Sequence, residues 1–359
     1  MRLLALDRFT WRRIYWILLV FLVILITVWW QPNRTFPTGG SLARDSANPQ
    51  QVKGAIQPIP LSVDLDVEKV ALGEELFRDK RLSADNQVSC LSCHHFKRGG
   101  ADRQTYSVGS GGVPGDINAL TVFNAGFNFR FNWNGAYETL EDQIQATLQN
   151  PKAMGSQWNE VVEELQATPE YPKLFARAYA DGLTAENIKD AIATYIKSLY
   201  TPNSRFDQYL KGDEQALTPD EKAGYQLFQD YGCISCHQGM NIGGNMFQRF
   251  GVIGDYFDPK DGITQADLGY YNVTKDEADR YVFRVPSLRN VALTAPYMHN
   301  GSVETLEEMV KIVAKAQLGR TLSEGDTDLI VQFLKTLTGE YLGGSLEKLA
   351  LDSDDDITS

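Results

Sequence analysis

Positive charge is scarce in this chain of 359 residues. The 34 Lys and Arg residues are outnumbered by 46 Asp and Glu residues, which gives a formal net charge of −12. Binding to nucleic acid depends on a surplus of basic side chains that neutralise phosphates, so the composition excludes a nucleic-acid partner. The acidic balance fits either a basic protein partner or simple solubility.

The sequence also lacks strand signals and a phosphate-binding loop. Most segments show apolar residues at helical intervals, and few show the alternation of a strand. The glycine-rich stretch 109–115 has neither a preceding strand nor the Lys-Ser/Thr ending of a phosphate loop. We therefore expect a mainly α-helical protein in which this stretch approaches another group closely through its backbone.

Cysteine and histidine are rare, with four of each. All four cysteines fall in two copies of Cys-x-x-Cys-His, one formed by Cys90, Cys93 and His94 and the other by Cys233, Cys236 and His237. This pattern is typical of c-type haem attachment, in which the two thiols form thioethers with the porphyrin and the histidine ligates the iron. The sequence therefore predicts two covalently bound haem c groups, which favours redox chemistry.

Three other kinds of site use Cys-x-x-Cys. Paired zinc knuckles lie about 15–20 residues apart, whereas these two pairs are far apart in the chain. A thioredoxin-type redox pair needs no histidine after its second cysteine. A structural disulfide in an oxidising compartment remains an alternative.

The N-terminus carries one long hydrophobic run. Residues 14–30 contain no charged side chain and are just long enough, with their flanks, to span a bilayer. Arginines precede the run, which places residues 1–13 in the cytoplasm by the positive-inside rule. We favour an uncleaved single-pass anchor over a cleaved signal peptide, because no small-x-small cleavage site follows. The remainder is then periplasmic, on the bacterial inner membrane, where c-type haem is attached.

The chain divides into segments by composition and periodicity. Residues 31–60 are rich in Pro, Gly, Ser, Asn and Gln, which is typical of a flexible linker, and residues 346–359 form an acidic tail. Between them we expect two cytochrome c-like haem domains. The N-terminal haem domain covers residues 61–205, and the C-terminal one covers residues 206–345.

A weak internal repeat supports two related domains. Gly73-Glu-Glu-Leu-Phe-Arg-Asp precedes the first haem motif and Gly224-Tyr-Gln-Leu-Phe-Gln-Asp precedes the second. Both predict a short helix that leads into Cys-x-x-Cys-His. Thr218 to Glu221 has the spacing of a capping box with proline at the first helical position, and Ser323 to Asp326 has the same spacing.

Further motifs resemble those of a known family. Phe131-Asn-Trp-Asn-Gly135, the segment from Asn290 to Gly301, and Ala316-Gln-Leu-Gly319 are similar to signatures of the bacterial di-haem cytochrome c peroxidases and their MauG-like relatives. The resemblance covers roughly residues 65–345. It implies that the first haem, on His94, reacts with peroxide and that the second, on His237, accepts electrons from a donor.

The resemblance also assigns residues around the two haems. Trp133 matches a tryptophan that lies between the haems as an electron relay, and core packing is the alternative. Gln143 matches a glutamine of the distal pocket, and Arg284 matches an arginine near the second haem that bonds a propionate. Calcium ligands at the domain junction correspond to Asn118, Thr294 and Pro296, whose hard oxygen donors suit that ion.

Two positions near the first haem depart from the family pattern. Ser110 replaces the switchable distal histidine, and a hydroxyl is a poor iron ligand, so we expect this haem to be open without reductive activation. Ala153, beside Met154, replaces the glutamate that transfers the proton during peroxide cleavage. Loss of an acid–base group costs about 10²–10⁴-fold in rate. Carboxylates nearby in sequence are expected to be surface charges.

A third departure concerns the second haem. Val313 stands where the family has a Met or Tyr sixth ligand, and it cannot bind iron. Met309, one helical turn earlier, and Met298 are candidates for that ligand, with buried packing as the alternative for each.

Two functions from different classes follow. The first is an enzyme that reduces hydrogen peroxide or another small oxidant, or uses it to oxidise a partner, with electrons from a small donor cytochrome or cupredoxin. The second is a non-peroxidatic electron carrier or gas-sensing cytochrome, which the three departures motivate. The sequence leaves the oligomeric state open, and a homodimer is one alternative because related peroxidases are often dimers.

Overall fold

The structure is a computed structural model that describes residues 54–258, 260 and 262–351. The predicted cytoplasmic N-terminus and transmembrane anchor, most of the predicted linker and the last part of the predicted tail lie outside the described residues. No helix within the described part of the chain has the length and hydrophobicity needed to cross a membrane.

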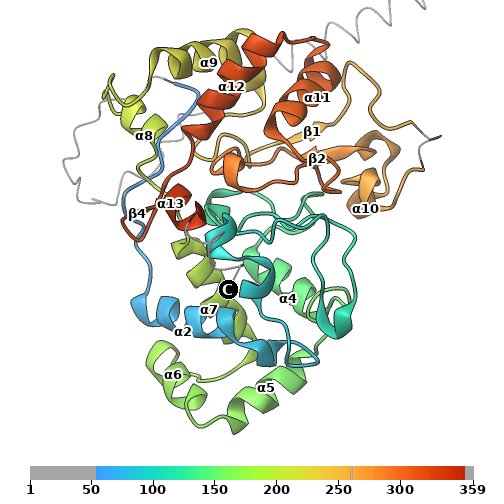
Figure 1. Cartoon of the computed structure of the whole chain (residues 1–359). Coiled ribbons are helices and arrows are strands. Elements are labelled where there is room, and N and C mark those ends of the chain that lie inside the picture. The colour runs from blue at the N-terminus through green and yellow to red at the C-terminus, as the bar shows by residue number, and fades with distance from the viewer. Residues whose placement is uncertain (1–53, 259, 261, 352–359) are drawn as a thin grey trace, which may run out of the picture. The chain divides into compact units, whose positions relative to one another are not determined.

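Helices dominate the described residues, which confirms the mainly α-helical prediction (Figure 1). The first half of the chain contains α2 (Val67–Arg78), α3 (Cys90–Cys93), α4 (Leu140–Gln149), α5 (Trp158–Ala167), α6 (Tyr171–Ala178) and α7 (Ala185–Ser198). The second half contains α8 (Arg205–Leu210), α9 (Pro219–Asp230), α10 (Tyr271–Thr274), α11 (Leu306–Leu318), α12 (Glu324–Lys335) and α13 (Leu346–Leu351).

Within the described residues, the strands form two short antiparallel pairs. Strand β1 (Phe247–Arg249) pairs with β2 (Val282–Arg284), and β3 (Glu340–Tyr341) pairs with β4 (Gly344–Ser345). The first pair carries Arg284 at its end, so it places that side chain beside the functional site.

Helix starts follow the predicted capping signals. Thr218 caps α9, where its hydroxyl accepts a hydrogen bond from the Glu221 amide and the Glu221 carboxylate accepts one from the Thr218 amide. Ser323 caps α12 by accepting from the Asp326 amide at 3.0 Å. These bonds satisfy amides that no intrahelical carbonyl reaches.

The internal repeat corresponds to two equivalent helix crossings. Helix α2 packs on α7, and a Cβ added at Gly73 would lie 2.1 Å from the Ala191 carbonyl oxygen. Helix α9 packs on α12, and a Cβ added at Gly224 would lie 2.0 Å from the Leu329 carbonyl oxygen. The repeated glycine therefore permits the same close backbone approach in both halves.

Two hydrophobic cores flank the segment between Leu199 and Phe206. The first core contains Leu76, Phe77, Phe175 and Ile192, and the second contains Phe206, Phe228, Phe333 and Leu337. Each half of the described chain therefore has a hydrophobic core of its own, and the bounds of the two expected haem domains stay a prediction.

The two ends of the described chain each join the core of the other half. Ile56 packs in the second core, and the Gly239 amide donates to the Ala55 carbonyl at 2.7 Å. Leu346, which is fully buried, packs in the first core. The predicted linker 31–60 and tail 346–359 therefore each contain an ordered part, because both include apolar residues that the cores bury.

A network of buried amides lies between the two cores. The Asn124 side chain bonds both the amide and the hydroxyl of Thr201 at 2.8 Å, and Asn290 donates to the same hydroxyl at 3.0 Å. Asn241 donates to the Asn124 carbonyl at 3.0 Å. All four residues are at most 2% exposed, so each broken bond would leave a buried polar group unsatisfied.

A buried ion pair fastens the N-terminal segment to the second core. Arg289 and Asp207 lie 2.8 Å apart, and both side chains are fully buried. The Arg289 guanidinium also donates to the Gln57 carbonyl, and Asp207 accepts from the Ile59 amide. The pair therefore satisfies backbone groups of the segment as well as its own charges.

The variant Asp207→Ala should lower the free energy of unfolding by about 3–5 kcal/mol, because it leaves a buried guanidinium without its counter-charge. Chemical denaturation of the holoprotein measures this change. The exposed Asp328→Ala is the matched control and should change stability by less than about 0.5 kcal/mol. A double variant, Asp207→Leu with Arg289→Met, should recover most of the loss. Equal stability of Asp207→Ala and the control would contradict the role of the pair.

Candidate functional site

The two Cys-x-x-Cys-His motifs line two separate cavities. The first cavity is lined by Cys90, Cys93 and His94, which lie on α3 and just after it. The second is lined by Cys233, Cys236 and His237, around the short 3₁₀ turn Cys233–Ser235. Because the two pairs lie in different cavities, they do not form a shared four-cysteine zinc site.

The four cysteines are not paired with one another. All four are free thiols. Burial raises the pKa of the Cys90 thiol to about 12 and that of Cys233 to about 11. Thioredoxin-type pairs instead need a lowered pKa, so these two thiols do not fit that chemistry. All four cysteines are half-buried and line a cavity, as haem attachment requires.

Each motif histidine is oriented by a backbone carbonyl. His94 Nδ1 lies 3.2 Å from the Gly100 carbonyl oxygen, and His237 Nδ1 lies 3.1 Å from that of Ile242. A hydrogen bond at Nδ1 fixes the tautomer in which Nε2 is free to ligate a metal. Burial lowers the pKa of His237 to about 4, which favours the neutral, ligating form.

The carbonyl beside His237 depends on an unusual backbone. Ile242 is fully buried and has a φ of 50°, a left-handed conformation that is rare for a β-branched residue. Such conformations persist where the surrounding structure requires them. At Ile242 this left-handed conformation turns the carbonyl toward the His237 ring.

A phenylalanine from the repeated segment stands beside each histidine. The ring centroids of Phe77 and His94 are 6.5 Å apart, and those of Phe228 and His237 are 6.4 Å apart. The repeat therefore reproduces the histidine, its carbonyl partner and the aromatic neighbour at both sites.

Arg284 provides a test of whether the cavities suit a haem. Its side chain is 3% exposed and lines both cavities, and its Nη1 has no hydrogen-bond partner. Burial lowers its pKa to about 10. Such a guanidinium needs an anionic partner. A haem propionate would supply one, so the arginine, the thiols and the histidines together fit two c-type haems.

Trp133 lies between the two cavities and lines both. Its indole nitrogen donates to the Asn118 carbonyl at 2.9 Å, and its own carbonyl accepts from the Arg284 amide at 3.0 Å. Its ring meets the ring of His299 edge-on at 6.4 Å. These contacts hold the indole in one orientation between the sites.

The first cavity has a hydrogen-bonding glutamine and no glutamate. Gln143 lines it and donates to the Asn132 side chain at 2.8 Å, and Ala153 and Met154 line it nearby. Asp116 is the one carboxylate among the described residues that line this cavity, and it pairs with Lys152 at 2.8 Å. The carboxylates Glu138 and Glu141 near Gln143 pair with basic side chains, as expected of surface charges.

Ser110 does not line the first cavity, although the preceding Gly109 does. The serine is buried, and its side chain is close enough to the Asp85 carboxylate to help lower the pKa of that group. The structure therefore differs from a simple replacement of a distal ligand by a serine, because position 110 is directed toward Asp85.

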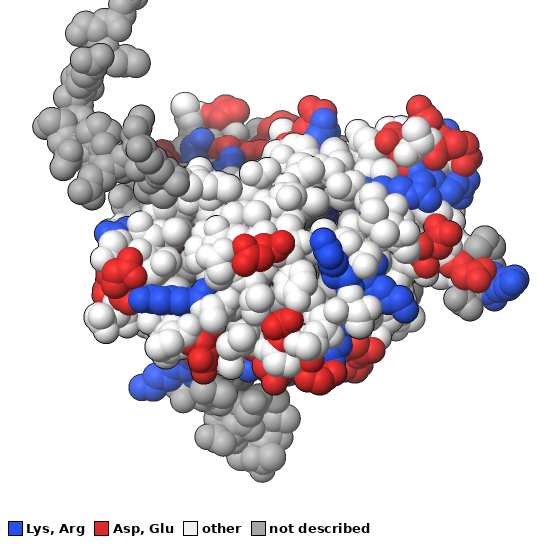
Figure 2. All heavy atoms as spheres, turned by 90° about the horizontal axis from the view of Figure 1, so that it is seen from above, with Lys and Arg blue, Asp and Glu red and all other residues white. Residues whose placement is uncertain are grey.

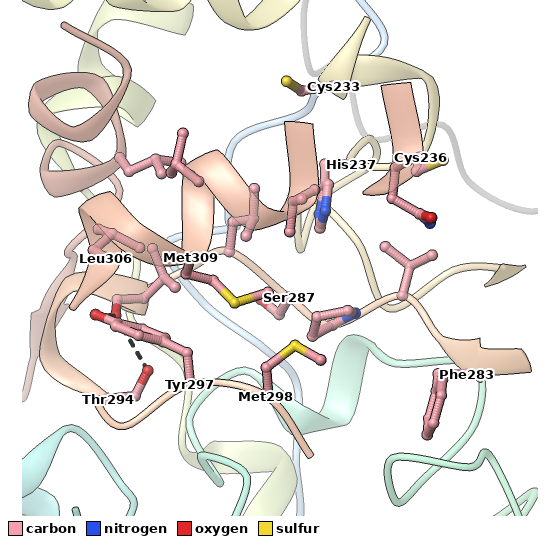
Figure 3. A pocket seen from close by; sticks show the side chains of 18 of the residues that line it. Cys233, Cys236, His237, Phe283, Ser287, Thr294, Tyr297, Met298, Leu306 and Met309 are labelled. Carbon is pink, nitrogen blue, oxygen red and sulfur yellow. Dashed lines mark hydrogen bonds between the residues drawn. The ribbon is translucent and has the colours of Figure 1, made fainter. Parts of the chain in front are cut away.

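Several candidate ligands face the second cavity. Met298 and Met309 both point their thioethers into it, with His237 at another wall (Figure 3). Val313 also lines it, but has no donor atom. His299 is engaged elsewhere, since its Nε2 lies 2.7 Å from the Asp267 carboxylate. The two methionines remain the candidates for a sixth ligand.

The three candidate calcium ligands line the same cavity, but no hydrogen bond joins them to one another, so the calcium site stays a prediction. Asn118, Thr294 and Pro296 all line the second cavity. The Asn118 side-chain nitrogen donates to the Gln104 carbonyl, and the Thr294 hydroxyl donates to the Val291 carbonyl.

Comparisons with known proteins agree with this site. A profile for "Di-haem cytochrome c peroxidase" matches residues 67–215. The chain is 40% identical over 297 residues to "Cytochrome c551 peroxidase" of Nitrosomonas europaea, covering 82% of this chain and 87% of that protein. The chain belongs to the di-haem cytochrome c peroxidase family. It is also 45% identical to "Cytochrome c peroxidase Ccp" of Escherichia coli K12, over 83% of this chain but only 64% of that longer protein.

Solved structures show the same fold. The crystal structure of "a MauG-like protein associated with microbial copper homeostasis" superposes with a TM-score of 0.68 at 30% identity. The match covers 88% of this chain and 97% of that one. Members of this family carry haem, which agrees with the cofactor inferred from the cavities.

Three features of the family site were missed in the sequence: the carbonyls of Gly100 and Ile242, and the Asp85 contact. Every residue type has a backbone carbonyl that can accept a hydrogen bond, so no residue pattern marks these two. A positive φ at Ile242 also has no sequence signal, because isoleucine disfavours it.

The variant Arg284→Gln should lower the reduction potential of the haem whose propionate it contacts, because loss of a nearby positive charge stabilises the oxidised iron. A shift on the order of 60 mV corresponds to a tenfold change in the equilibrium constant of a one-electron transfer. Potentiometric titration of the holoprotein measures it. Arg280→Gln, which alters a half-buried arginine that is paired with Glu277 and lines neither cavity, is the control. An unchanged potential at both haems would show that Arg284 has no propionate partner.

Proposed function

We propose that this protein reduces hydrogen peroxide at the His94 site with electrons that enter at the His237 site. The single observation that carries the proposal is the shared lining of the two cavities by Trp133 and Arg284. An aromatic side chain fixed between two redox sites provides a short route for electrons. Bound haem supplies one-electron redox chemistry and, where a coordination position is open, a place for a small oxidant.

The chain's own residues around the first cavity have distinct roles in this proposal. Gln143 offers a hydrogen bond to an oxygen of the oxidant, while its bond to Asn132 fixes its orientation. His94 is held in its ligating tautomer by Gly100. Gln143 cannot exchange a proton at neutral pH and Ala153 has no acid group, so we expect peroxide cleavage to be slow relative to a site with a glutamate.

The electron donor in this proposal is a small cytochrome or cupredoxin. Figure 2 shows that acidic and basic side chains are mixed across the described part of one face, with uncharged residues between them. That face carries no large area of a single charge sign, so it offers little long-range attraction to a strongly charged donor.

Membrane attachment, compartment and assembly are further parts of the proposal. The uncharged run 14–30 supports a single-pass anchor in the bacterial inner membrane, with the haem domains in the periplasm. A calcium ion held by Asn118, Thr294 and Pro296 would join the two halves, since these residues come from both. A homodimer rests on resemblance to related peroxidases.

A second function is favoured by two positions. Ala153 leaves the first cavity without the family glutamate, and Val313 leaves the second without the family ligand. Both changes are compatible with a cytochrome that carries electrons or senses a small gas and does not turn over peroxide. Substitutions at Ala153 and Val313 can therefore distinguish the two functions.

Mixing the fully oxidised holoprotein with a slight excess of hydrogen peroxide should produce a rapid absorbance change that a reduced donor reverses. Stopped-flow absorbance measures the rate. If Ala153 limits proton transfer, Ala153→Glu should raise the rate of peroxide cleavage, by up to about 10²–10⁴-fold. Ala167→Glu, at the end of α5, is the control. If the unaltered protein shows no absorbance change over seconds, the peroxidase proposal is wrong. That result would favour an electron carrier or a gas sensor.

One of the two methionines should be required for a thioether bond at the second haem. A thioether ligand raises the potential of a haem, so Met309→Leu or Met298→Leu should lower it and remove the methionine-to-iron absorption band. Redox-poised absorbance spectra distinguish the two variants. Met246→Leu, outside both cavities, is the control. Spectra unchanged in both variants would show that each methionine only packs.

A further inference from the structure

The loop from Ser107 to Asp116 forms part of the wall of the first cavity. Gly109, Gly115 and Asp116 line the cavity. Gly111 and Gly112 have φ values of 69° and 73°, which only glycine adopts readily. A segment this rich in glycine has many accessible conformations when it is free, so its observed path needs fixed contacts.

Asp85 supplies the first of these contacts from outside the loop. Its carboxylate accepts a hydrogen bond from the Gly111 amide at 2.6 Å, and the Ser110 side chain lies near it. Ser83 and the Gln87 amide also donate to it, at 3.2 and 3.1 Å. These bonds, led by the one from Gly111, lower the pKa of Asp85 to about 2, so it is an anion at neutral pH.

The second contact joins the loop to the segment that carries Ala153. The Ser110 amide donates to the Ala153 carbonyl at 2.7 Å. A Cβ at Gly109 would lie 2.5 Å from the Lys152 carbonyl oxygen, so the two backbones are packed as closely as glycine permits. The Lys152–Asp116 ion pair closes the same junction at the other end of the loop.

Together these contacts decide where position 110 points. The Ser110 side chain is buried against Asp85, outside the lining of the cavity, while its neighbour Gly109 forms the wall. Rotating position 110 toward the cavity would move the Ser110 side chain away from Asp85 and disturb the neighbouring bond from the Gly111 amide to Asp85.

We propose that Asp85 is a latch that holds the 107–116 loop in place and keeps position 110 turned away from the distal side of the first haem. Asp85 is a positioning residue in this scheme, since it acts through the loop and does not face the cavity. The inference rests on the proposed function only in that an open distal side is what a peroxide-reducing site requires.

The latch is tested first by hydrogen exchange of the oxidised holoprotein. A hydrogen bond to a charged acceptor protects its amide, so Asp85→Ala should speed exchange in residues 109–113 by about tenfold or more. Asp85→Asn keeps an acceptor oxygen, so its exchange rate should lie between those of the wild type and Asp85→Ala. Asp181→Ala, which alters a carboxylate bonded to Asn187 in the same half, is the control and should leave the loop unchanged. Unaltered loop exchange in Asp85→Ala would overturn the latch.

A second test places a ligand at position 110 and reads the spin state of the oxidised iron. With Asp85 present, Ser110→His should remain mainly high-spin, because the latch directs residue 110 away from the cavity. In the Asp85→Ala background the same histidine should reach the iron and produce a low-spin spectrum. Equal low-spin fractions in the two backgrounds would contradict the proposal.

Neither test depends on turnover, so the two hypotheses fail separately. A wild-type protein that ignores peroxide but shows the expected exchange and spin-state differences retains the latch and loses the peroxidase function. Fast peroxide reduction in the wild type, with no effect of Asp85→Ala on exchange or spin state, retains the function and rejects the latch.

Discussion

The arrangement of both sites depends on the buried amides between the two cores. Asn124, Thr201, Asn241 and Asn290 bond one another across the junction, and none of them can turn to solvent. Because unsatisfied buried groups are costly, the halves are held in one relative position. That position is what allows one tryptophan and one arginine to line two cavities at once. A flexible junction would leave each haem site intact but would remove the defined route between them.

Duplication explains the symmetry of the sites and also their differences. Each half repeats a glycine at a helix crossing, a phenylalanine beside the motif histidine and a carbonyl at its Nδ1. These features surround Nδ1 of each histidine. Both sites need the same thing there, which is a histidine held in the tautomer that leaves Nε2 free to ligate a metal. The opposite walls differ, with an amide and a glycine loop in one cavity and two thioethers in the other. The two sites therefore differ in the side chains that line the part of each cavity where an external ligand would bind.

The sequence predicted the features that depend on residue type. The Cys-x-x-Cys-His motifs, the repeated Gly73 and Gly224, and the caps at Thr218 and Ser323 each require a particular residue type at a particular position. Features set by the backbone were not predictable, such as the left-handed Ile242 and the direction in which Ser110 points. The packing of Ile56 and Leu346 was missed because a few apolar residues inside a polar segment give no periodic signal.

The exchange of chain ends between the two halves has a consequence for biosynthesis. Leu346, near the end of the chain, fills the core that surrounds the first haem, while Ile56, near the start of the described residues, fills the core of the second. The first half therefore lacks part of its interior until residue 346 has been made. The core around the first site is completed only after the residues of the second core, such as Phe333 and Leu337, have been synthesised.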